Sequence, residues 1–178
     1  LLNDVGPEIT PESITRIMAY AGRTPPQPDF ESAVRAFTES YRIAYPDADE
    51  DFWREQVSRT WRQARNGEWR PDYDPKIGDS LRNAVKAARL VAWLRKLGIR
   101  RLKGVNLDPW DNFRAMDMPT LLLRGAHSDV LSPEIVARMR EVKPDLQVVE
   151  IPRRGHVPLL DEPESLTALD GFLADLRN

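Results

Sequence analysis

Two short apolar runs near the C-terminal end constrain the fold of this chain more than any other feature. The first covers residues 121–123 and the second residues 146–151, and each stops at a turn. A helical pattern follows each run, and these patterns begin at Pro133 and Pro163. The order strand, helix, strand, helix favours a parallel pair joined by a right-handed crossover. In such a sheet the carboxyl ends of the strands share one edge, which is where ligands bind.

Two side chains fall at this predicted edge, because Asp129 follows the first run and His156 follows the second. A carboxylate beside a histidine fixes the imidazole tautomer, while the other ring nitrogen takes a proton from a nucleophile. The positions therefore indicate an acid and a general base, and the alternative is a loop histidine with no partner. His127, Ser128 and Asp129 cannot themselves be a triad, because consecutive loop side chains do not converge on one proton path.

The first hundred residues have a different pattern. An apolar start ends at Gly6-Pro7, and residues 8–107 then carry helical periodicity and loops, with an ambiguous stretch at 99–107. Capping residues and helix breakers predict four helices here. They begin near Thr10, Asp29, Asp49 and residues 79–80, and end at Gly22, before Pro46, at Asn66-Gly67 and at Gly98. Because this segment is inserted between two apparent strands, we expect a helical lid over the sheet edge.

Composition excludes several classes of function. The chain has 178 residues, of which 30% are charged and 41% apolar, and its net charge is -2. We therefore expect neither nucleic acid nor a membrane as a partner. The absence of cysteine is compatible with a cytoplasmic location. We expect no cofactor and no metal: Asp47, Asp49 and Asp51 imitate a calcium loop, but Phe52 and Ser58 replace its glycine and glutamate.

Three stretches, residues 2–8, 122–129 and 155–163, together resemble the C-terminal part of an α/β-hydrolase-fold enzyme. In that family the nucleophile comes first along the chain, then the acid, then the histidine. The resemblance implies that Asp129, after the penultimate strand, is the triad acid and that His156, after the last strand, is the general base. It also implies three segments: the end of a core strand (1–7), a helical lid (8–107) and the C-terminal part of the α/β core (108–178).

Asp4 offers a second candidate for the acid. Some members of the family carry the acid after the strand that precedes the lid, which is where Asp4 lies. We favour a turn or capping role for this residue, because Gly6-Pro7 follows it directly. Tryptophan is common in the lid segment, and Trp53 and Trp61 are spaced for the core of one helix. One or two of the tryptophans could instead line an apolar pocket.

The chain contains no G-x-S-x-G, so the strand-to-helix turn that presents a nucleophile is missing. We therefore expect a fragment that does not turn over substrate alone. The complete enzyme would hydrolyse a small, fairly apolar ester or a related carbon-centred substrate. A serine nucleophile would make it an esterase or carbon–carbon hydrolase, and an aspartate a dehalogenase or epoxide hydrolase. The alternative is a non-catalytic fragment or interaction module that pairs with a missing N-terminal half or a second copy.

Overall fold

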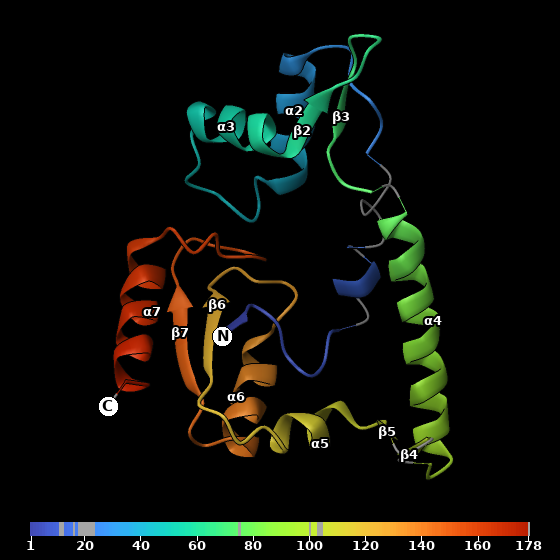
Figure 1. Cartoon of the computed structure of the whole chain (residues 1–178), viewed down its shortest axis with the longest axis vertical. Coiled ribbons are helices and arrows are strands. Elements are labelled where there is room, and N and C mark those ends of the chain that lie inside the picture. The colour runs from blue at the N-terminus through green and yellow to red at the C-terminus, as the bar shows by residue number, and fades with distance from the viewer. Residues whose placement is uncertain are drawn as a thin grey trace.

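The fold consists of a small sheet unit and a second unit of two helices and a hairpin. A long helix connects the two units (Figure 1). The computed structural model describes the chain except for residues 11, 12, 16, 18–23, 75, 100, 103, 104 and 178. We call β1, β6 and β7 with α5, α6 and α7 the sheet unit. We call residues 24–74, which hold α2, α3, β2 and β3, the aromatic unit. In Figure 1 the aromatic unit lies above the upper end of the sheet strands.

The sheet unit contains three parallel strands in the order β1-β6-β7. They are β1 (Leu2–Asn3), β6 (Leu121–Gly125) and β7 (Gln147–Ile151). The helices of this unit are α5 (Pro109–Arg114), α6 (Pro133–Val142) and α7 (Pro163–Asp175). The predicted parallel pair with an intervening helix is therefore confirmed. The predicted helix starts at Pro133 and Pro163 are also confirmed. Helix α5 begins on a proline as well, at a position where the missing N–H is not needed.

Alternate residues of β6 bury their side chains on opposite faces of the sheet. Leu122 packs with residues of α5 and α6. Leu121 and Leu123 pack with Ile151 and with Phe172 of α7 on the other face. Successive side chains of a strand point to opposite faces, so a strand that is apolar at every position needs cover on both. The two helical layers hold the carboxyl ends of β1 and β6 in place.

The aromatic unit begins with α2 (Phe30–Tyr41) and α3 (Glu50–Thr60), whose predicted caps are confirmed. The third predicted helix was expected to run to Asn66-Gly67, and this is wrong. Helix α3 ends at Thr60, and an antiparallel hairpin follows, formed by β2 (Trp61–Gln63) and β3 (Trp69–Pro71). The Asn66-Gly67 pair is a turn signal between two short strands, and Gly67 adopts a φ of 87° that suits glycine.

Helix α4 (Ile77–Lys96) runs along one side of the molecule and connects the aromatic unit to the sheet unit (Figure 1). A short antiparallel pair follows, formed by β4 (Arg101–Leu102) and β5 (Val105–Asn106), each a strand of two residues. Several apolar side chains of α4 are exposed, including Trp93 at 56%. None of the helices in the described ranges is both long and apolar enough to cross a membrane. Of the first predicted helix, residues 13–15 and 17 are helical, while Pro11, Glu12 and residues 18–22 lie outside the described residues.

Candidate functional site

The candidate site lies at the carboxyl edge of the sheet and contains a paired histidine and aspartate. His156 follows β7, and its Nδ1 lies 2.9 Å from Oδ2 of Asp4, which follows β1. The Asp4 carboxylate is fully buried, whereas the imidazole is 27% exposed. Within the described part of the chain, Nε2 of this ring has no hydrogen-bond partner. A histidine in this arrangement is oriented through one nitrogen and presents the other.

Three donors converge on the buried carboxylate of Asp4. Besides the imidazole, Oδ1 accepts from the backbone N–H of Gly125 at 3.1 Å, and Oδ2 accepts from the Ser128 hydroxyl at 2.6 Å. The residue adopts a φ of 53°, which a short polar side chain tolerates better than most, and its own N–H donates to Leu123. Such a group of donors compensates a buried carboxylate for its lost hydration. The Asp4 carboxylate is therefore held in one position by its neighbours.

Gly125 explains how the histidine reaches an aspartate two strands away. This glycine ends β6, the central strand, and a Cβ there would lie 2.4 Å from the Gly155 carbonyl oxygen and 2.5 Å from that of Arg154. The histidine loop therefore crosses directly over the end of β6. A side chain at position 125 would force either β6 or this loop to move. The loop passes close over β6 at the same place where His156 contacts Asp4.

The sequence argument expected Asp129 beside His156 and treated Asp4 as a turn residue. The carboxylate at Nδ1 is instead that of Asp4. Asp4 also lies at a bend, with a φ of 53°, so its place in a turn and its contact with the histidine occur together. Asp129 is exposed in the loop between β6 and α6, where its backbone oxygen accepts from the Ser13 hydroxyl. The neighbouring Ser128, expected as a turn residue, holds Asp4 through its hydroxyl. A catalytic role for Asp129 stays a prediction, and variants described below test it.

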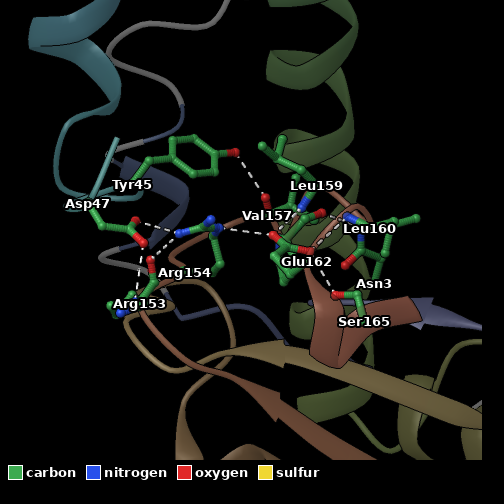
Figure 2. Close-up of polar contacts among 11 residues, drawn as sticks. Asn3, Tyr45, Asp47, Arg153, Arg154, Val157, Leu159, Leu160, Glu162 and Ser165 are labelled. Atoms are coloured by element: carbon green, nitrogen blue, oxygen red, sulfur yellow. Dashed lines mark hydrogen bonds and ion pairs between the residues drawn. The ribbon is translucent and has the colours of Figure 1, made fainter. Parts of the chain in front are cut away.

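Tyr45 connects the aromatic unit to the residue after the histidine. Its hydroxyl donates to the backbone oxygen of Val157 at 2.9 Å, as Figure 2 shows. Burial raises the pKa of Tyr45 to about 12. The hydroxyl therefore stays protonated and able to donate throughout the neutral pH range. This bond ties the histidine loop to the aromatic unit.

Tyr45 also lines a cavity of about 380 Å³ between the aromatic unit and the start of α4. Most of the lining is apolar or aromatic, and several hydroxyl groups interrupt it. The lining residues are Thr24, Ala36, Phe37, Ser40, Tyr41, Tyr45, Gln56, Thr60, Trp61, Pro71, Tyr73 and Ile77. Trp61 is thus one tryptophan that lines an apolar pocket, as the sequence allowed. A pocket of this size and chemistry suits a small apolar group with one or two polar atoms.

Charged side chains elsewhere do not gather into a cation site: among the described residues, no three histidine, aspartate or glutamate side chains are grouped as metal ligands. The acids at positions 47 and 49 have other contacts. Asp49 caps α3 by accepting from the N–H of Phe52. Asp47 accepts from two arginines of the histidine loop.

Comparison with known proteins shows which family the chain resembles. The sequence pattern described as "Alpha/beta hydrolase family" matches residues 12–169. A 3-hydroxybutyrate-oligomer hydrolase of Cupriavidus necator is 30% identical over 175 residues, which cover 97% of this chain and 55% of that protein. An N-formylmaleamate deformylase of Pseudomonas putida is 38% identical over 60 residues, 34% of this chain and 20% of that protein.

A solved structure agrees with the sequence matches. The crystal structure of an α/β hydrolase from Novosphingobium aromaticivorans has a TM-score of 0.72 and 34% identity, and the match covers 97% of this chain and 55% of that one. The chain spans about half the length of the Cupriavidus relative and of this structure. The strand order, the helices on both faces and the family match agree with one another. The chain belongs to the α/β hydrolase family.

Proposed function

We propose that Asp4 and His156 are the acid and the general base of a hydrolytic triad. The observation that carries the proposal is the 2.9 Å contact between Nδ1 and the buried Asp4 carboxylate. In this role Asp4 holds the tautomer with the proton on Nδ1 and stabilises the imidazolium. Nε2 takes the proton of the attacking nucleophile and later gives it to the leaving group. Asp129 is the alternative acid.

The proposed substrate is a small, fairly apolar ester. The cavity beside Tyr45 supports this, because its lining offers apolar contact with a few hydroxyl groups. The name of the Cupriavidus relative, an oligomer hydrolase of 3-hydroxybutyrate, also points to hydroxy-acid esters as first substrates to test. In this arrangement the aromatic unit is a lid that holds the acyl or alcohol part, and the sheet edge holds the reacting carbonyl.

The proposed nucleophile comes from outside these 178 residues, because the chain has no G-x-S-x-G. The nucleophile supplies the attacking atom, and backbone N–H groups beside it stabilise the oxyanion. Strand β1 supports a further partner strand, since among the described residues it pairs with β6 alone. We therefore expect the isolated chain to be inactive. The alternative is a non-catalytic role, in association with a second copy of the chain. Measurable hydrolysis by the intact protein, meaning this chain together with the part that supplies the nucleophile, would exclude that alternative.

A variant series in the intact protein tests the assignment. With a chromogenic short-chain ester and a 3-hydroxybutyrate dimer, Asp4→Asn and His156→Ala should lower kcat by roughly 10³- to 10⁴-fold. Asp129→Asn should lower it less than about threefold, as expected for an exposed residue outside the reacting groups. If Asp129→Asn lowers kcat more than Asp4→Asn does, the acid of the triad is Asp129 and not Asp4. Unchanged hydrolysis by His156→Ala would remove the proposed function.

A further inference from the structure

The loop that carries the histidine is held from two sides. On one side the N–H of Gly155 donates to the Ala44 carbonyl at 2.6 Å, and the Tyr45 hydroxyl donates to Val157. On the other side the Asn3 side-chain amide donates to the Pro158 carbonyl at 2.9 Å. Backbone groups before, just after and two residues after the histidine are therefore bonded to other parts of the chain. The position of His156 depends on where those parts lie.

Arg154 joins the two sides through its guanidinium (Figure 2). Nη1 donates to Oδ1 of Asp47 in the aromatic unit at 2.6 Å, and Nε donates to Oε1 of Glu162 at 3.0 Å. Glu162 immediately precedes α7 of the sheet unit. Since a guanidinium is planar and its donors have a fixed geometry, it sets the separation and direction of both carboxylates. One side chain thus links the aromatic unit, the histidine loop and the sheet unit.

The Glu162 carboxylate is itself held in place by several hydrogen bonds. It is 4% exposed and also accepts from the N–H groups of Leu159 and Leu160 and from the Ser165 hydroxyl. Burial by itself would raise the pKa of Glu162. The hydrogen bonds and the Arg154 charge outweigh that effect, so the pKa lies below its usual value. The carboxylate is therefore charged at neutral pH and keeps its ion pair with Arg154.

The neighbouring arginine provides a natural comparison. Arg153 also contacts Asp47, at 3.2 Å, but its side chain is 69% exposed. Arg154 is 19% exposed and has the additional buried partner Glu162. An exposed ion pair contributes little, whereas a partly buried, charge-assisted pair is stronger and better defined. Two adjacent residues of one type thus share a partner and differ in their connection to the sheet unit.

We infer that Arg154 is a positioning residue for the general base: through Asp47 and Glu162 it fixes the histidine loop so that His156 faces Asp4. This inference rests on the proposed function of His156. Loss of the link allows the loop to shift, and misplacement of a catalytic group by about 1 Å can lower the rate 10²-fold. The effect falls on kcat, because Arg154 is not among the residues that line the cavity.

Steady-state kinetics of the intact protein give the first test. Arg154→Met should lower kcat by roughly 10- to 100-fold with KM nearly unchanged. Arg154→Lys, which keeps the charge but cannot bridge both carboxylates in the same way, should recover part of the loss. Arg153→Met is the matched control and should stay within about twofold of the wild type. Equal losses in the Arg153 and Arg154 variants, or a loss confined to KM, would overturn the inference.

Nitrogen-15 NMR of the two histidines gives a second test that needs no turnover. The wild type should show a protected Nδ1 proton on His156, and Arg154→Met should lose it to exchange while the exposed His127 is unchanged. Asp47→Asn, at a partly exposed position, breaks only the link to the aromatic unit and should give an intermediate loss. If Arg154→Met keeps the protected proton, Arg154 does not position the base. If instead His156→Ala keeps full activity, the proposed function fails while this NMR result still stands.

Discussion

The cores of the sheet unit and the aromatic unit differ in their share of aromatic side chains, which is larger in the aromatic unit. The sheet buries aliphatic side chains completely: Leu122 and Leu123 are 0% exposed. The aromatic unit is built around Tyr45, Trp53 and Trp61, which are 6–7% exposed, and it lines most of the cavity. Closely packed aliphatic chains fix the ends of the strands, whereas rigid aromatic rings offer a ligand a large apolar contact area. The sheet is thus suited to hold catalytic groups in place, and the aromatic unit to receive a ligand.

Truncation of a sheet leucine should have the largest effect on stability. Leu123→Ala removes a fully buried side chain from between β7 and α7 and should lower the free energy of unfolding by about 3–5 kcal/mol. Phe37→Ala, at the wall of an existing cavity, should cost less stability and mainly raise KM. Urea unfolding and ester kinetics on both variants measure the difference. Equal stability losses would mean that the two cores are packed alike.

Substitution of Gly125 tests the place where the histidine loop crosses the sheet. Gly125→Ala places a Cβ 2.4 Å from a backbone oxygen, so either β6 or the loop must move. We expect a loss of about 2–3 kcal/mol from overpacking, with a fall in kcat larger than that of Leu123→Ala. Thermal unfolding and kcat measure the two effects. Normal kcat in a folded Gly125→Ala protein would show that the close approach does not control the contact between His156 and Asp4.

Glu162→Gln should have a smaller effect that depends on pH. The variant removes the charge from a buried network and should cost about 2 kcal/mol at pH 7. The pKa of Glu162 is lowered in the folded state, so its contribution is complete above the usual value of 4.5 and is lost as pH falls through the lowered pKa. Urea unfolding should therefore give a lower free energy of unfolding for Glu162→Gln than for the wild type at pH 7. Below pH 4.5 the two free energies should become similar. Glu164→Gln, an exposed neighbour, is the control, and a constant difference at all pH values would contradict the interpretation.

The features that were predictable from sequence are those with a local cause. Helix caps such as Asp29 and Asp49, and the apolar run of β6, are set by residues a few positions apart. The partner of His156 was not predictable in this way, because 152 positions separate it from Asp4. Strand β1 has only two residues and carries no periodicity that could reveal its place beside β6. The family resemblance gave the correct sheet edge, but it favoured Asp129, whose loop directly precedes the strand unit with His156.

The hairpin after α3 was missed for a different reason. Trp61 lies eight positions after Trp53, which fits a helical stripe, and the helix pattern was therefore extended through it. In the structure Trp61 is buried in the same core as Trp53 but from a strand, paired with Pro71. Burial alone does not distinguish the two periods over so short a stretch. The Asn-Gly pair was the local signal that could have identified the hairpin.

Gly171→Ala should change the free energy of unfolding least, and it should raise this free energy where the other variants lower it. Gly171 lies inside α7, and a Cβ there would meet no atom within 4 Å. Alanine loses less conformational entropy than glycine in a helix, so the variant should be stabilised by about 0.5–1 kcal/mol. Far-ultraviolet circular dichroism follows all helices. In a background with Trp93→Phe and Trp110→Phe, the remaining tryptophans report by fluorescence on the aromatic unit, and they are Trp53, Trp61 and Trp69. If the two units unfold together, both probes shift to higher urea by the same amount. If only circular dichroism shifts, the sheet unit unfolds separately, and the contacts of Arg154 and Tyr45 hold two units together that are stable on their own.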